Sequence, residues 1–266
     1  MSIEYQKLIS LIERIAPPDL AEGWDNCGVQ IYTGTDRINR IIVALEISKA
    51  VIREAAGINA DLIVVHHPLI FSKINKIDHN NIIGKYICEL IKGNISVYAA
   101  HTTFDSVFGG NSDFLAELLG LQNIRRLQPK EKSSEPAAYG RIGDLESEMR
   151  LIDVGLLLKE KLHINYDLPT VGDPDTMIKK VGVCTGGGGS MLEDFFRNGC
   201  SLFITSDIRH HEAMFARECG ICLIDAGHFY TEIIFVENFA EKLRIAVGDI
   251  AEVYESKADF SPYNHI

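Results

Sequence analysis

Three apolar runs typical of β-strands end in histidine, and this pattern constrains the chain more than any other feature. The runs and the histidines that follow them are Asp61–Val65 with His66 and His67, Ile95–Ala100 with His101, and Ile221–Gly227 with His228. In open α/β sheets, binding sites form just beyond the carboxyl ends of the strands. Imidazole and carboxylate groups are ligands of Zn, Fe and Mn. The pattern predicts a metal site assembled from distant parts of the chain, and we expect it to hold two ions.

Two of these histidines are followed, four residues later, by a carboxylate: Asp105 after His101 and Glu232 after His228. In a helix this spacing places both side chains on one face. Each acid also has a plainer interpretation. Asp105 could cap a helix or lie in a turn, and Glu232 could complement the dipole of a helix N-terminus. We expect both acids to be ligands, and His101 to be a ligand, a residue that orients a ligand, or a proton carrier with a catalytic role.

The adjacent histidines His66 and His67 can converge only where a strand turns into a loop, because neighbouring side chains of a strand point to opposite faces. Pro68 favours an extended conformation at His67 and prevents a helix from starting there. Two imidazoles placed in this way can bind different ions of a pair about 3.5–4 Å apart. The alternative is a pair of ordinary surface histidines.

Other motifs give weaker indications. The run Cys184–Ser190 holds four glycines between a strand and a helix, where backbone N–H groups often bind phosphate. Gly186 and Gly187 are therefore candidates to bind the phosphates of a nucleotide, and a flexible turn is the alternative. His211 could bind substrate at the mouth of the site, or it could face solvent at a helix start that Asp207 caps.

The segment Gly23–Gly28 contains the chain's only tryptophan, Trp24, followed by two polar residues. Asp25 and Asn26 could orient a ligand imidazole through a hydrogen bond to the ring nitrogen that does not bind the metal. They could equally form an Asx turn.

Strand-like and helix-like segments alternate along the chain, which predicts an α/β fold with mostly parallel or mixed sheets. The order strand, helix, strand, histidine occurs twice, so we expect two similar lobes that face a shared metal-binding cleft. A polar, irregular stretch from 121 to 136 indicates a boundary. We expect residues 1–125 with 226–266 to form the first lobe, which carries most of the ligands, and residues 126–225 to form the second.

Composition narrows the class of protein. The 266 residues are 46% hydrophobic, enough for a substantial core. No apolar run approaches the roughly 18 residues of a membrane span, and the first residues do not resemble a signal peptide. The six scattered cysteines favour reduced thiols in the cytoplasm. A net charge of −11 repels the phosphate backbone, so we expect neither a nucleic-acid partner nor a membrane.

Taken in order, these motifs resemble a known family along nearly the whole chain. The matching segments are Gly23–Gly28, His66–Pro68, His101–Gly120, Cys184–Gly188, Thr205–Asp207 and Gly227–Glu232. The chain resembles the dinuclear-metal-centre hexameric proteins, also known as GTP cyclohydrolase 1 type 2 homologues. Two departures from that family are Glu46 in place of the usual aspartate and Ser206 in place of the usual glycine.

The resemblance implies two divalent ions per chain, Zn, Fe or Mn, and a toroidal hexamer. It carries the metal ligands over onto His66, His67, Asp105, His228 and Glu232. It also implies a metal-dependent hydrolase, with a cyclohydrolase-type activity on a purine nucleotide such as GTP, in which His101 or His211 moves protons. Two alternatives are a metal-dependent phosphoesterase and a non-catalytic metal-binding ring that acts as a scaffold or regulator.

Overall fold

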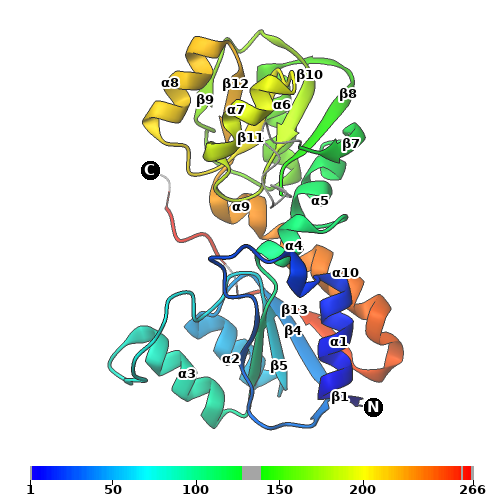
Figure 1. The fold of residues 1–266 in the computed structure, drawn as a ribbon, viewed down its shortest axis with the longest axis vertical. Helices are drawn as coiled ribbons and strands as arrows, with labels where there is room; N and C mark the ends of the chain where they lie inside the picture. The colour runs from blue at the N-terminus through cyan, green and yellow to red at the C-terminus, as the bar shows by residue number, and fades with distance from the viewer. Residues whose placement is uncertain (1, 128–138, 259, 265–266) are drawn as a thin grey trace. The chain divides into compact units, whose positions relative to one another are not determined.

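The computed structural model describes residues 2–127, 139–258 and 260–264, and the chain forms two compact units (Figure 1). The first unit comprises Met1–Val107 and Phe235–Phe260, and the second comprises Phe108–Ile234 and Ser261–Ile266. Each unit is a mixed α/β structure, so the expected fold class is confirmed. The part of the expected boundary stretch that runs from 128 to 136 lies outside the described residues.

A five-stranded sheet forms the centre of the first unit, with the strand order β13-β4-β5-β6-β2. Its strands are β2 (Gly28–Ile31), β4 (Arg40–Ala44), β5 (Leu62–Val65), β6 (Ser96–Ala99) and β13 (Glu252–Glu255). Neighbours from β13 to β6 are parallel, whereas β2 pairs antiparallel with β6. Two short strands, β1 (Ile3–Glu4) and β3 (Arg37–Ile38), form a separate antiparallel pair. The last strand of the chain, β13, lies at one edge of this sheet.

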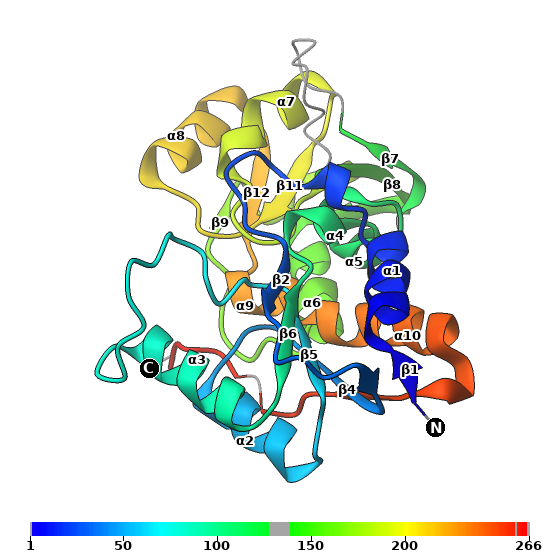
Figure 2. The same cartoon turned by 60° about the horizontal axis from the view of Figure 1, so that its bottom comes forward.

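Helices cover both faces of this sheet, which explains its continuous apolar strands. The helical segments of this unit are α1 (Tyr5–Ile15), η1 (Pro18–Leu20), α2 (Lys49–Gly57), α3 (Ile82–Lys92), α4 (Thr102–Ser106), α10 (Ile234–Val247) and η3 (Gly248–Ile250). Figures 1 and 2 show α2 and α3 together on one face and α1 and α10 on the other. Ile42 and Ile63 pack with α2 and α3, and their strand neighbours Ile41 and Leu62 are equally buried.

The second unit is built on a six-stranded sheet with the order β7-β8-β10-β11-β12-β9. Its strands are β7 (Gln122–Arg126), β8 (Arg141–Arg150), β9 (Thr170–Val171), β10 (Met177–Val183), β11 (Leu202–Thr205) and β12 (Cys222–Asp225). The three central strands, β10, β11 and β12, are parallel, and the outer strands are antiparallel. The polar segment β7 was expected to be irregular. It forms a strand because it lies at the sheet edge, where exposed polar side chains are tolerated.

The helices of the second unit contribute to two separate cores. They are α5 (Asn111–Leu118), α6 (Leu151–Lys161), η2 (Gly189–Met191), α7 (Leu192–Arg197), α8 (His210–Cys219) and α9 (His228–Glu232). Leu115 of α5 and Leu158 of α6 belong to one core, and Phe195 of α7 and Ala216 of α8 belong to the other.

The elements α5, β7 and α9 belong to the second unit. Residues 1–125 and 226–266, which include most of these elements, were expected to form the first lobe. Leu115 and Ala116 bury α5 in a core of the second unit, and β7 pairs with β8. As a result, Asp105 belongs to the first unit, while His228 and Glu232 belong to the second.

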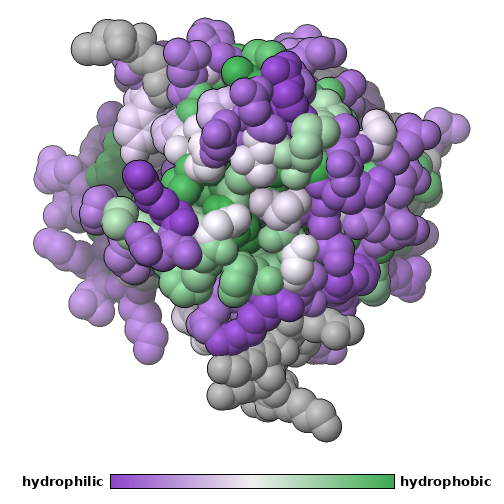
Figure 3. Space-filling view, turned by 90° about the horizontal axis from the view of Figure 1, so that it is seen from above, coloured by the Kyte–Doolittle hydropathy of each residue, from purple (hydrophilic) through white to green (hydrophobic). Residues whose placement is uncertain are grey.

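None of the helices in the described part of the chain is both long and apolar enough to cross a bilayer. Figure 3 shows one face of the molecule, on which hydrophobic residues gather centrally among hydrophilic ones. Apolar atoms supply roughly 55–60% of the surface of an ordinary folded protein. A patch of this kind therefore does not by itself indicate a partner.

Candidate metal centre

Three histidines meet at one edge of the first unit's sheet. His66 and His67 directly follow β5, and His101 follows β6 by two residues. These strands are parallel neighbours, with Val65 paired to Ala99, so their carboxyl ends lie side by side. One ring nitrogen from each histidine lies within 4.8 Å of the others, a spacing that could hold a metal ion.

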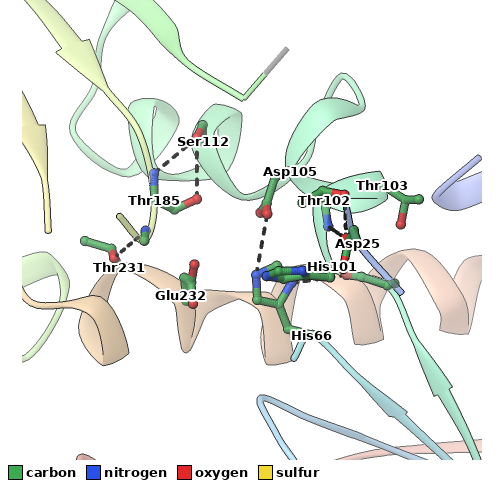
Figure 4. A network of polar contacts seen from close by, with 12 residues as sticks. Asp25, His66, His101, Thr102, Thr103, Asp105, Ser112, Thr185, Thr231 and Glu232 are labelled. Atoms are coloured by element: carbon green, nitrogen blue, oxygen red, sulfur yellow. Dashed lines mark hydrogen bonds and ion pairs between the residues drawn. The ribbon is translucent and has the colours of Figure 1, made fainter. Parts of the chain in front are cut away.

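The orientation of His66 favours a cation. Its imidazole is fully buried, and Nδ1 lies 3.1 Å from the carbonyl oxygen of Ala100. A carbonyl can only accept a hydrogen bond, so Nδ1 is the protonated nitrogen. The other ring nitrogen, Nε2, lies on the side of the Asp105 carboxylate, 3.6 Å from Oδ2 (Figure 4). A buried carboxylate beside an imidazole nitrogen is stabilised by a positive charge, carried either by a proton on the ring or by a metal ion between the two atoms.

Asp105 lies inside a helix, four residues after His101. The short helix α4 begins after His101, and the backbone N–H of Asp105 donates to the His101 carbonyl. The side chain is buried. Asp105 is therefore neither the N-cap nor a turn residue, and its carboxylate is directed toward His66.

His101 is fixed by Asp25 from the loop before β2. Its Nδ1 lies 3.0 Å from Oδ1 of Asp25 (Figure 4). The other carboxylate oxygen, Oδ2, accepts hydrogen bonds from the N–H and hydroxyl of Thr102 and from the thiol of Cys27. Burial would raise the pKa of Asp25, but the hydrogen bonds from His101, Cys27 and Thr102 outweigh it and hold this pKa well below its usual range. A permanent carboxylate thus binds the Nδ1–H of His101 and leaves Nε2 as the possible ligand atom.

Two further polar contacts surround this group. Oε2 of Glu46, just after β4, lies 3.7 Å from Nδ1 of His67. Glu46 stands where the family usually has aspartate, and its longer side chain reaches this histidine. Asn26 has a different role from the one expected. Its amide donates to the carbonyl of Ile70 at 2.6 Å, and no contact between Asn26 and an imidazole occurs among the described residues.

A second histidine–carboxylate group lies in the second unit. His228 begins α9, and its Nε2 lies 2.9 Å from Oε2 of Glu232, one helical turn later. On its other side, Nδ1 lies 2.6 Å from Oδ2 of Asp207, in the loop after β11. The hydrogen bond with Glu232 is the main cause that raises the pKa of His228 to about 9; burial opposes this, and Asp207 adds to it. His228 is thus held between two carboxylates, as a metal-binding imidazole is held between an ion and an orienting acid.

The glycine run packs against this group. Gly186 has a φ of +65°, and a Cβ at this position would overlap Oε1 of Glu232. Its N–H donates to the hydroxyl of Thr231 at 3.0 Å, as Figure 4 shows, and the N–H of Gly188 donates to the hydroxyl of Thr205 at 2.8 Å. The N–H of Gly186, one of the two donors expected to bind phosphate, is thus occupied within the unit. A Cβ on Gly187 would lie 3.7 Å from the carboxylate of Asp207, whose negative charge opposes phosphate at that position.

Two other sequence expectations concern residues near this loop. His211 lies exposed in the first turn of α8, where Glu212 accepts from the backbone N–H of Arg209. Asp207 does not cap that helix, because its carboxylate contacts His228 instead. The residue with positive φ is Asp207 itself, at 54°, so Ser206 does not require the conformation for which glycine is usual.

Sequence reasoning missed three contributors to these groups. The thiol of Cys27 and the hydroxyl of Thr102 hold Asp25, and Asp207 holds His228. For Asp207, the available signal was its position after the strand β11, the same signal that identified the histidines.

The fold and these groups define an α/β protein with histidine and carboxylate clusters that could bind metal ions. The model of the Duf34/NIF3 (NGG1p interacting factor 3) family matches residues 3–262, and the chain belongs to this family.

Similar proteins support this assignment. A Clostridium perfringens protein named "GTP cyclohydrolase 1 type 2 homolog" is 35% identical over 259 residues, which cover 97% of this chain and 98% of that one. A Clostridium acetobutylicum protein of the same name is 34% identical over 266 residues, with 99% of each chain covered. The crystal structure of a Bacillus cereus protein related to NIF3 matches the fold with a TM-score of 0.91 at 23% identity, over 99% of both chains.

Proposed function

We propose that this protein is a divalent-metal-dependent hydrolase with a dinuclear centre. His66, His67 and Asp105 of the first unit and His228 and Glu232 of the second would hold the two ions. The proposal that both groups serve one centre rests on their complementary chemistry, three imidazoles and two carboxylates, and on the family resemblance. The observation that carries most weight is the position of His66 Nε2 beside the buried Asp105 carboxylate, 3.6 Å from Oδ2.

The donor set fits divalent ions such as Zn, Fe or Mn. Each ligating imidazole has a fixed partner at its second nitrogen or a carboxylate beside it: the Ala100 carbonyl at His66 and Asp207 at His228. Partners of this kind set the tautomer and the ring direction of metal-binding histidines. A carboxylate can also bridge two cations, a role we propose for Asp105 and Glu232. When bound, a pair of divalent ions lowers the pKa of a water toward about 7.

The protein's own residues would then manage the protons. His101 is held by Asp25 at Nδ1, so its Nε2 can accept a proton from water and later donate it to a leaving group. The low pKa of Asp25 keeps its carboxylate ionised, and this negative charge stabilises the imidazolium that forms at His101. His211, exposed on α8, is the second candidate for proton movement or for binding substrate.

For the substrate we propose a purine nucleotide such as GTP, with water attacking the imidazole carbon of the base before the ring opens. This choice rests on the names of the relatives alone. We also propose assembly into a toroidal hexamer, as the resemblance implies. The six free cysteines fit a reducing compartment such as the cytoplasm.

The deciding experiment combines elemental analysis of protein purified without chelator with a substrate screen after metal reconstitution. Two equivalents of a divalent ion per chain and release of formate from GTP would support the proposal. Release of phosphate or of a nucleoside monophosphate would indicate phosphoester hydrolysis at the same centre. A metal-loaded hexamer that is inactive on a broad nucleotide panel would favour a scaffold or regulatory role.

A further inference from the structure

Two large aromatic side chains stand exposed beside the histidines of the first unit. Trp24 is 59% exposed and Phe71, in the loop after His67, is 56% exposed. Their ring centroids are 6.0 Å apart, and they lie 6.1 Å and 6.4 Å from that of His101. Aromatic rings bury up to about 150–250 Å² each when covered. Leaving two of them open at the same place is therefore costly for the unliganded unit.

Hydrogen bonds hold the two rings at this spacing. Asn26, two residues after Trp24, donates to the carbonyl of Ile70, the residue before Phe71. The side chain of Gln30 accepts from the N–H of Ile70 at 3.1 Å and donates to the carbonyl of Asn26 at 2.7 Å. Two hydrogen bonds thus join the two segments, and the third holds Gln30 against Asn26, so the aromatic pair is positioned before any ligand arrives.

The same loop also positions His101. Asp25, between Trp24 and Asn26, binds Nδ1 of this histidine. The planes of Trp24 and Phe71 both stand at 78° to the imidazole. A flat ligand lying parallel to Trp24 would not stack on His101, whose Nε2 would be left for a hydrogen bond or proton transfer.

We propose that Trp24 and Phe71, whose planes are inclined at 55°, form an aromatic subsite that presents a planar heteroaromatic ring to His101, with the ligand stacked on Trp24 and its edge packed against Phe71. The inference rests on the proposed function for the reacting centre. It adds Trp24 and Phe71 as the residues that select the substrate class, and Asn26 and Gln30 as the residues that position these two rings. A small ligand is favoured over a protein partner because the exposed rings adjoin three imidazoles whose nitrogens lie within 4.8 Å of one another. A few polar groups beside aromatic walls are typical of small-molecule sites.

Trp24 is the only tryptophan, so its fluorescence reports on this subsite directly. Metal-free protein is titrated with guanosine, adenosine and, as a probe without an aromatic ring, ribose 5-phosphate. We expect saturable quenching by both nucleosides and none by ribose 5-phosphate. Phe71→Ala should raise the Kd for guanosine about 2- to 13-fold, the value of a tilted or edge-to-face aromatic contact. Phe71→Tyr should restore binding.

A matched control is Phe196→Ala, which removes an exposed phenylalanine of the second unit and should leave the Kd unchanged. Gln30→Ala should raise the Kd for guanosine while the metal content of the protein stays that of the wild type. A raised Kd for guanosine with an unchanged metal content would show that Gln30 positions the rings and would exclude general damage to the fold.

Four results would overturn the inference: no saturable response to either nucleoside, an equal response to ribose 5-phosphate, an unchanged Kd in Phe71→Ala, or Trp24 emission that responds to protein concentration alone. The last result would show that a second copy of the chain covers the rings. Because the titration uses metal-free protein, it is independent of the proposed hydrolase. Nucleoside binding without metal uptake would refute the proposed function only, and metal-dependent hydrolysis with an unchanged Phe71→Ala would refute the subsite only.

Discussion

Gly186 and Glu232 approach so closely that no side chain fits between them. A Cβ on residue 186 would overlap Oε1 of Glu232, and the backbone at Gly186 has a φ of +65°. The glycine run therefore lets a strand-to-helix turn pass directly beside a candidate metal-binding carboxylate.

We expect Gly186→Ala to lower both the stability of the protein and its metal affinity. The left-handed conformation alone costs a non-glycine residue about 1–2 kcal/mol, and the overlap would displace the Glu232 carboxylate. Gly187→Ala is the matched control, because its Cβ would meet Asp207 at ordinary contact distances. Chemical denaturation and metal titration of both variants test the expectation, and equal behaviour of the two would contradict it.

Asp105→Ala should remove bound metal and any hydrolytic activity together, because the carboxylate beside His66 is lost. Metal content by elemental analysis and the rate of product release are measured on the same samples. Asp153→Ala, which removes a partly exposed aspartate of the second unit, serves as the control and should match the wild type in metal content and activity. Retention of both metal and activity in Asp105→Ala would refute its assignment as a ligand.

Asp25→Asn should lower the hydrolytic rate by about 10²- to 10⁴-fold, the usual contribution of a positioned general acid–base, while the metal content stays close to that of the wild type. The amide keeps the shape of the side chain but loses the charge that holds Nδ1–H of His101. Cys27→Ala removes only one of the donors to Asp25 and should have a smaller effect. Elemental analysis and the rate of product release are measured on both variants, and equal losses of rate would contradict the role given to Asp25.

The raised pKa of His228 predicts a pH-dependent stability of the metal-free protein. Because the folded pKa is about 9 and the ordinary value is 6.5, the protonated imidazole stabilises the fold fully below about pH 6.5. That contribution is lost as the pH rises from about 6.5 to about 9. Denaturation of chelated protein across this range measures it. The change should be absent in His228→Gln and kept in His79→Gln, which alters an exposed histidine of the first unit.

The same proton competes with a metal ion, since Nε2 of His228 must lose it before it can bind one. Metal affinity should therefore rise with pH up to about 9. An affinity that is constant between pH 6.5 and 9 would contradict the placement of His228 among the ligands.

A buried ion pair supports the second unit. Nε of Arg141, which is fully buried, lies 2.7 Å from Oδ1 of Asp113. Asp113→Ala should lower the free energy of unfolding by about 3–5 kcal/mol, because it leaves a buried guanidinium without its carboxylate. Asp153→Ala breaks an exposed pair with Arg150 and should change stability little. Urea denaturation compares the two, and similar midpoints would show that the buried pair contributes little.

Much of the fold could be predicted from the sequence because its signals are local. Apolar strands, helical spacing and the residues that end each element are visible within short windows, as for β5 before His66. The parallel pairing of β5 and β6 then brings His66 and His101 to one edge of the sheet. Four-residue spacing likewise placed Asp105 and Glu232 one helical turn from a histidine.

What the sequence left open depends on contacts between distant segments. An Asx turn and an orienting role suited Asn26 equally, and its actual partner, the carbonyl of Ile70, has no signature in the sequence. The glycines after β10 suggested a phosphate-binding turn because their packing against Glu232 cannot be inferred locally. The strand β7 was missed for a related reason, since its polar residues gain strand structure only by pairing with β8.

Trp24, Asp25 and Asn26 are consecutive, yet their side chains make three different contacts. Trp24 lies beside Phe71, Asp25 binds the ring of His101, and Asn26 donates to the backbone carbonyl of Ile70. Deleting or inserting one amino acid here would move all three side chains away from their contacts at once. This short stretch should therefore tolerate replacement by chemically similar residues far better than any change in its length.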